Sequence, residues 1–258
     1  MKTIRPVILA DMKGSRGHPL SSPNRPLQFR SLIQDDTPFQ DTLERVSAPE
    51  FLPPLILTPQ SLVEIIEEEC DEIAFDYEEL LITPEGTCDD SALLQAAQWA
   101  QARREVFPLL VCPAHHFVLD QTAFMRAVHD GAQTAEQGYV VSFGVVAQWA
   151  ETAYDYIEVG TRLHAGYSGH HVLSFVEKPE RGQAQSLLDA HRFVWNGGIY
   201  CALPETVINR LSSGNEDQSL SAQLFTQDGP VCVVSLLTVW SDLSVWSGLW
   251  KALNLQET

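Results

Sequence analysis

A short loop near the start of the chain holds residue types that could bind a phosphate group. Apolar Val7–Ala10 runs into a loop that contains Gly14 and Gly17, with Arg16 between them. Glycines let backbone N–H groups approach an anion, and a strand that leads into such a loop is typical of phosphate-binding turns. Asp11 stands at the mouth of this loop, where its carboxylate would repel a phosphate. The loop is therefore either a working phosphate site or the remnant of one.

Two pairs of adjacent histidines offer nitrogen atoms of the kind that bind metal ions. His115 and His116 follow one apolar segment, and His170 and His171 precede another. Adjacent residues on a strand point to opposite faces of the sheet. We therefore do not expect either pair to hold one ion together.

Apolar segments alternate with helical patterns, and these elements must position the polar residues. We expect strands at Val7–Ala10, 53–58, 107–114 and 139–147. We expect helices within 35–46, 59–75, 91–104 and 120–138. In the first helix Phe39 and Leu43 form the apolar face, and Thr37 or Asp41 can cap it. The alternation predicts an α/β fold with a parallel or mixed sheet that is covered on both faces.

The charge of the chain limits its partners. The 258 residues include 34 acidic and 16 basic side chains, and the formal net charge is −18. Such a surface repels nucleic acid and anionic membranes, so we expect neither as a partner. No apolar run reaches the roughly 20 residues that a bilayer requires, and no signal-peptide pattern begins the chain. The five cysteines are scattered and suggest no disulfide framework. We expect a cytoplasmic protein without membrane insertion.

Several stretches resemble bacterial mannose-1-phosphate guanylyltransferases of the sugar-nucleotidyltransferase family. The opening loop is similar to the family's AGGSGTRLWPLSR, which is followed there by PKQF. "VCPAHH" resembles the family's PADH segment, and "FVEKP" followed by "WNGGIY" resembles FVEKP and WNSGMF. "ETAYDYI" and "WSDLSVW" resemble ETGYGYI and the W-D-G-S-W segment. The order of these motifs extends the resemblance over nearly the whole chain.

The resemblance implies a single nucleotidyltransferase-like domain over residues 1–258. Its fold would be Rossmann-like (GT-A-like), with a mixed and mainly parallel sheet. The segment between "WNGGIY" and Trp240 is much shorter than in the family, which implies a reduced sugar-binding lobe. From the same comparison we expect no counterpart of the family's common C-terminal extension.

The resemblance also implies a reaction in polysaccharide biosynthesis. The phosphate oxygen of mannose 1-phosphate attacks the α-phosphorus of GTP, which yields GDP-mannose and pyrophosphate and requires Mg²⁺. Arg16 and Asp242 match catalytic positions, and Gly14 and Lys13 match the nucleotide-binding loop. Asp242 is also the possible metal ligand, whereas His115 takes the place of the other metal-binding aspartate and is a poorer candidate.

The sugar side of the family pattern is better preserved than the nucleotide side. The positions that the resemblance assigns to sugar-phosphate binding are Lys178, Glu151, Glu177, Asn196 and Gly198. Lys178 matches the lysine that would meet the sugar phosphate, and a glycine replaces the family's serine at position 197.

Each retained residue also has a purely structural explanation. Trp195, Trp246 and Trp250 could fill the core. Glu177–Pro179 could be a turn at the end of a strand, and Asp242 could cap a helix. These alternatives remain open at the level of sequence.

The substitutions concentrate on the positions that would bind the nucleotide. Asp11 and Met12 replace the paired loop glycines, and Leu27 replaces the lysine of PKQF. Thr87–Asp89 replaces the Arg-Asn-Thr that would contact the base and ribose, and His115 replaces a metal-binding aspartate. Loss of one phosphate-neutralising cation typically removes several kcal/mol of transition-state stabilisation, about a factor of 10² or more in rate.

These losses favour a degenerate guanylyltransferase with little or no activity, a pseudoenzyme. It would bind a sugar phosphate or nucleotide sugar, or contact an active paralogue or a polysaccharide-assembly protein, and would need no cofactor. The alternative is an active, divergent nucleotidyltransferase that uses Mg²⁺ to make GDP-mannose or a related sugar nucleotide. A third hypothesis is an interaction module that uses only the surface of the fold.

Overall fold

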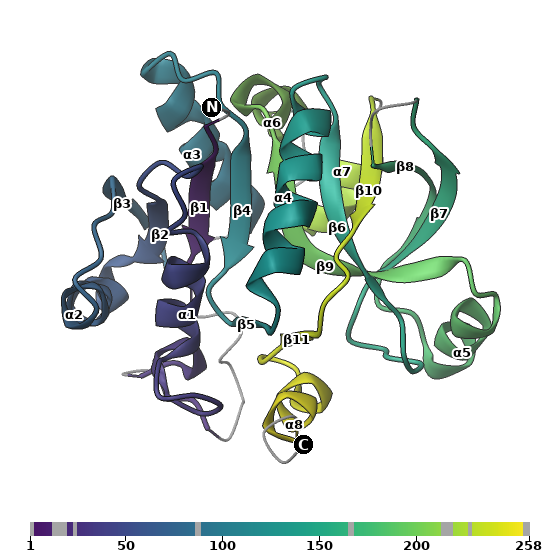
Figure 1. Cartoon of the computed structure of the whole chain (residues 1–258), viewed down its shortest axis with the longest axis horizontal. Helices are drawn as coiled ribbons and strands as arrows, with labels where there is room; N and C mark the ends of the chain where they lie inside the picture. The colour runs from purple at the N-terminus through teal and green to yellow at the C-terminus, as the bar shows by residue number, and fades with distance from the viewer. Residues whose placement is uncertain are drawn as a thin grey trace. The chain divides into compact units, whose positions relative to one another are not determined.

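The computed structural model describes residues 3–11, 20–22, 25–85, 89–164, 168–212, 219–226 and 229–254 (Figure 1). The chain forms two compact units. The first contains residues 1–96, 111–119 and 239–258, and the second contains 97–110 and 120–238. The single nucleotidyltransferase-like domain over 1–258 stays a prediction.

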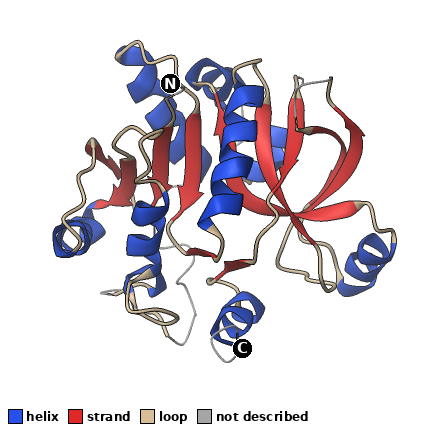
Figure 2. Cartoon of the chain, viewed as in Figure 1, coloured by secondary structure: helices blue, strands red, loops and turns tan. Residues whose placement is uncertain are grey.

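The first unit is built on parallel strands. β1 (Arg5–Leu9) pairs with β2 (Leu55–Pro59), and β2 pairs with β3 (Glu79–Thr83) (Figure 2). β4 (Leu109–Pro113), which enters this unit at Val111, follows β1 in the strand order. Every residue of β1, β2 and β4 is buried, as expected for strands of a parallel sheet.

Short elements complete the first unit. α1 (Pro38–Arg45) begins with a capping box in which Thr37 and Gln40 bond to each other's backbone. The remaining elements are η2 (Leu27–Phe29), η3 (Gln60–Leu62), α2 (Val63–Glu72), β5 (His116–Val118), β11 (Trp240–Asp242) and α8 (Trp246–Asn254). β5 and β11 form a separate antiparallel pair. α3 (Asp89–Ala102) begins in this unit and ends in the second.

The second unit contains five strands whose pairings close on themselves. They are β6 (Val140–Val146), β7 (Tyr156–Arg162), β8 (His170–Val176), β9 (Phe193–Ala202) and β10 (Val231–Ser235). The order is β9-β6-β10-β8-β7, and β7 pairs again with β9. Its helices are α4 (Gln121–Ala135), α5 (Arg181–Asp189), α6 (Pro204–Leu211) and α7 (Leu220–Thr226).

The sheet is mixed, as the sequence predicts. The mainly parallel character that was expected holds in the first unit, where both β1–β2 and β2–β3 are parallel. In the second unit only β6–β10 is parallel, whereas the other four pairings are antiparallel. Within the described ranges, no helix combines the length and the apolar character that a bilayer crossing demands.

The three tryptophans that could fill the core, according to the sequence, have different environments. Trp195 is 1% exposed and packs against Trp149 and Tyr154. Trp246 and Trp250 on α8 are 56% and 62% exposed. The core interpretation is therefore confirmed for Trp195 and wrong for the other two.

Candidate functional site

Several residues of the predicted nucleotide site lie outside the described ranges. Gly14, Lys13 and Arg16 are among them, as are Thr87 and Cys88. The assignment of the first three to phosphate binding and catalysis stays a prediction. The neighbouring Leu27, however, is described.

Leu27 is part of the hydrophobic core of the first unit. Its side chain is 0% exposed within an apolar cluster made with Ile33, Phe117, Leu243 and Leu249. Segments that are far apart in sequence thus meet around this leucine. A charged side chain could not be held here without a partner, because burial of an isolated charge is very costly. At the position of the family's phosphate-neutralising lysine, this chain has a core residue.

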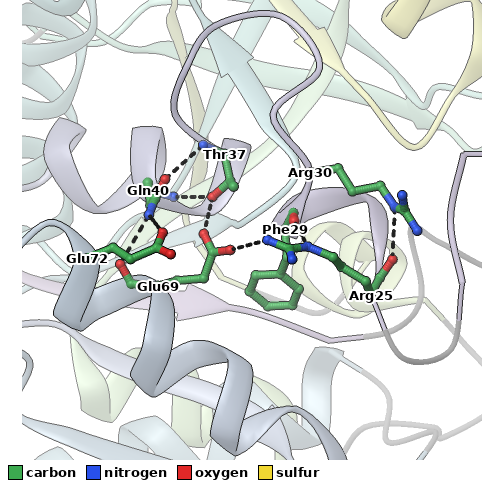
Figure 3. A network of polar contacts seen from close by, with 7 residues as sticks. All are labelled: Arg25, Phe29, Arg30, Thr37, Gln40, Glu69 and Glu72. Carbon is green, nitrogen blue, oxygen red and sulfur yellow. Dashed lines mark hydrogen bonds and ion pairs between the residues drawn. The ribbon is translucent and has the colours of Figure 1, made fainter.

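A buried carboxylate binds residues on either side of the segment that contains Leu27. Glu69 of α2 is 2% exposed, and its burial raises its pKa. The hydroxyl of Thr37 donates to this carboxylate, and Arg25 forms an ion pair with it at 3.4 Å (Figure 3). Arg25 also donates from Nε to the carbonyl oxygen of Phe29, at 2.7 Å. The network thus joins Arg25, which precedes η2, to the last residue of η2, to α2 through Glu69 and, by way of Thr37, to the start of α1.

The first unit also contains a group of three side chains that could hold a metal ion. His115, His116 and Asp242 each offer one ligand atom, and these atoms lie within 4.8 Å of one another. His115 Nε2 is 3.5 Å from Asp242 Oδ1. The antiparallel pairing of β5 with β11 places Asp242 opposite His116.

The expectation that His115 and His116 point to opposite faces is therefore wrong. It assumed that both lie on one strand, but β5 begins at His116 and His115 belongs to the turn before it. The two imidazole rings have centroids 5.0 Å apart and are nearly perpendicular. The alternation rule applies only within a strand, so the turn frees His115 to lie beside its neighbour.

The surroundings of His116 favour its neutral form. Its side chain is 3% exposed, and burial, followed by the nearby His115 and Arg45, lowers its pKa well below the usual value. Its Nδ1 has no hydrogen-bond partner among the described residues. Asp242 is fixed by Ser244, whose N–H and hydroxyl donate to Oδ1 at 2.8 and 2.6 Å.

The second unit brings together most of the predicted sugar-phosphate positions. Lys178 lies in the turn after β8 with a positive φ of 35°, which is unusual for a residue with a side chain. Its N–H donates to Asp155 Oδ1 at 3.3 Å. The carbonyl oxygen of Asp155 accepts from the N–H of Asn196 at 2.9 Å. Asp155 therefore joins the turn of Lys178 to strand β9.

Asn196 is a buried scaffold residue. Its side-chain oxygen accepts from Ser142 at 2.8 Å. Its amide nitrogen donates to Tyr200 at 2.7 Å and to Ser221 at 3.1 Å. Both amide hydrogens are thus engaged within the protein. Two residues on, Gly198 has a φ of 67°, which only glycine adopts readily.

Glu151 organises its own loop. One carboxylate oxygen accepts from the N–H groups of Thr152 and Ala153, and the other accepts from Trp149 Nε1. Glu177, by contrast, is an exposed neighbour of Lys178. The five predicted positions therefore comprise an exposed pair, Glu177 and Lys178, and three residues with structural roles in the loop between β6 and β7 and in β9.

Sequence reasoning missed Asp155. Burial raises the pKa of this carboxyl, while the hydrogen bond from Ser221 and the charge of Lys178 oppose the shift. The signal was available, because "ETAYDYI" has an aspartate where the similar ETGYGYI has its second glycine. Asp155 places a carboxylate beside the cation that would bind a phosphate.

The fold is that of the α/β nucleotidyltransferases, with a mixed sheet. The nucleotidyl transferase family model matches residues 5–258, and the chain belongs to this family. It is 28% identical over 276 residues to the alginate biosynthesis protein AlgA of Pseudomonas aeruginosa, and the match covers 95% of this chain and 57% of that protein. It is 29% identical over 281 residues to the mannose-1-phosphate guanylyltransferase of Sinorhizobium fredii, with 96% and 54% covered.

A solved structure supports the same assignment. The crystal structure described as mannose-1-phosphate geranyltransferase from Thermus thermophilus is 27% identical, with a TM-score of 0.81. The match covers 98% of this chain and 79% of that chain. The chain spans a little over half the length of the curated relatives it matches.

Proposed function

We propose that this chain is a mannose-1-phosphate guanylyltransferase-like protein that retains sugar-phosphate binding and has little or no transferase activity. The observation that carries the proposal is the burial of Leu27 in the core of the first unit. No rearrangement of one side chain would return a cation to this position. A nucleotide triphosphate would then lack one of the charges that stabilise the transfer of its α-phosphorus.

The proposed binding of a sugar phosphate rests on residues of the second unit. Lys178 is exposed on a turn whose left-handed conformation is held by Asp155, and such strained turns cluster at ligand sites. Lys178 would act as a point charge on the phosphate, which suits a compact ammonium group. Asn196 and Glu151 would hold the surrounding backbone rather than contact the sugar through free side-chain atoms. Any role beyond binding would pass through contact with a partner protein of polysaccharide assembly.

Calorimetry with mannose 1-phosphate, GTP and GDP-mannose tests this proposal, together with an assay of pyrophosphate release. We expect mannose 1-phosphate to bind and turnover to lie far below the common enzyme range of about 1–10³ s⁻¹. Lys178→Ala should weaken mannose 1-phosphate binding by about 10- to 150-fold, as for the loss of a charge-assisted contact. Arg126→Ala removes another exposed cation from the second unit, on α4, and should change affinity little.

The opposite results would overturn the proposal. Tight GTP binding without mannose 1-phosphate binding would place the retained function at the nucleotide loop. Pyrophosphate release at an ordinary enzymatic rate would show that the loss of the lysine is compensated.

A second candidate function is an active, divergent nucleotidyltransferase. The group of His115, His116 and Asp242 favours it, because a metal ion held there could neutralise phosphate charge. The pyrophosphate assay, repeated with each divalent ion, separates the two candidates.

A further inference from the structure

The group of His115, His116 and Asp242 does not fit the ion that the family resemblance implies. Mg²⁺ requires near-octahedral coordination by oxygen atoms, usually carboxylates, phosphates and water. Two of the three ligand atoms here are imidazole nitrogens, and only Asp242 offers oxygen. Imidazole suits zinc, copper, nickel, cobalt and iron instead.

The geometry of the group suits a single ion. Its ligand atoms lie within 4.8 Å of one another, and they come from a turn, strand β5 and strand β11 of the first unit. The Nδ1 of buried His116 lacks a hydrogen-bond partner among the described residues, although a buried polar atom normally has one. Ser244 bonds to Oδ1 of Asp242, and outer partners of this kind hold a carboxylate ligand in place.

We propose that His115, His116 and Asp242 form a site for a transition-metal ion of the Zn²⁺ or Co²⁺ type, in preference to Mg²⁺. Three protein ligands leave at least one coordination position for water or a ligand oxygen, as in open zinc sites. The replacement of the family's aspartate by His115 thus exchanges the metal preference of the site. This preference does not depend on whether the chain catalyses nucleotidyl transfer.

The competing explanation is an ion pair between His115 and Asp242. Their 3.5 Å separation is compatible with such a pair. An ion pair, however, involves neither His116 nor its unpartnered nitrogen. It would also give the protein no affinity for Co²⁺ beyond that of any surface histidine.

The experiment is a titration of the metal-free full chain with Co²⁺, followed by visible absorption, and a calorimetric titration with Mg²⁺. Zn²⁺ is then added to displace the bound Co²⁺. We expect one equivalent of Co²⁺, displacement by Zn²⁺, and a Mg²⁺ affinity weaker by about 100-fold or more, since imidazole ligands follow the Irving–Williams order. No substrate is present, so the outcome does not depend on activity.

Two variants assign the site. His115→Ala should weaken Co²⁺ binding by at least about 10-fold, because loss of even an outer partner costs 10- to 100-fold. His115→Asp should weaken Co²⁺ binding and strengthen Mg²⁺ binding, because it restores an oxygen ligand. His115, whose side chain is 16% exposed, tolerates replacement better than buried His116. Thermal unfolding verifies that each variant is folded.

His171→Ala is the matched control. This exposed histidine belongs to an adjacent pair in the second unit, as His115 does in the first, and its loss should leave Co²⁺ binding unchanged. Equal or tighter binding of Mg²⁺ by the unmodified chain would overturn the proposal. So would Co²⁺ binding that survives His115→Ala in a folded protein, because His115 would then not be a ligand. Absence of Co²⁺ binding by the unmodified chain would also overturn it and would leave His115 and Asp242 as an ion pair only.

Discussion

Leu27 shows how one substitution can give a position a structural role in place of a ligand-binding one. In the family pattern that the sequence resembles, a lysine at this place meets a phosphate. Here the leucine packs with Phe117, Leu243 and Leu249 and has no exposed surface. A buried core leucine therefore stands where the family pattern has a phosphate-binding cation.

Leu27→Lys should destabilise the protein strongly. An ammonium group at this site would lose its hydration without gaining a partner, and an uncompensated buried charge costs about 3–5 kcal/mol. Leu27→Met, which nearly conserves volume, should cost less than about 1.5 kcal/mol. Urea unfolding of the two variants measures the difference. A Leu27→Lys variant as stable as the wild type would mean that the side chain can reach solvent.

Asp155 and His115 show the limits of prediction at single residues. The sequence identified His115 as a departure from a family pattern but gave no role to Asp155, and it could not say what either side chain contacts. For His115 the answer depends on where a turn ends and a strand begins. For Asp155 it depends on Lys178, which is 23 residues away along the chain and adjacent in space.

The elements themselves were largely predictable. The apolar run at 139–147 became β6, and the pattern around Phe39 and Leu43 became α1, capped by Thr37, one of the two residues expected. Such signals are local, because burial on one side of a helix or strand repeats along the sequence. The closed pairing of β7 with β9 was not predictable, because strand neighbours far apart in sequence leave no local pattern.

Strand β9 contains a position where the family's serine should no longer fit. A Cβ at Gly197 would lie 2.6 Å from the carbonyl oxygen of Phe143, beside the irregular register between β6 and β9. Backbone cannot move aside as cheaply as a flexible side chain. We therefore expect Gly197→Ser to destabilise the protein by about 1–3 kcal/mol, as for other overpacked sites.

Gly182→Ser on α5 is the control for this prediction. A Cβ there meets no atom within 4 Å, so its stability should change little or rise slightly. Chemical unfolding of both variants gives the comparison. Equal stabilities would show that β6 and β9 separate easily at this point.

At the scale of the molecule, the chain passes repeatedly between its two units. It leaves the first within α3, returns within β4, leaves again after Leu119 and returns at Val239. The core around Leu27 therefore includes residues from both ends of the described chain. This interleaving could not be read from composition, which shows no linker-like segment between independent domains.

The acidic charge of the whole chain leads to a final prediction about stability. The chain has a net charge of −18, so its negative side chains repel one another in the compact state. Salt screens this repulsion between charges separated by more than about 10 Å at 0.1 M ionic strength. The melting temperature at pH 8 should therefore rise as NaCl is added. Replacing exposed Glu67 and Glu68 of α2 by lysine should raise the melting temperature at low salt and reduce its salt dependence. Replacing both by glutamine should give an intermediate result. A melting temperature that falls with salt, or a slope unchanged in the lysine variant, would mean that local ion pairs outweigh the net repulsion.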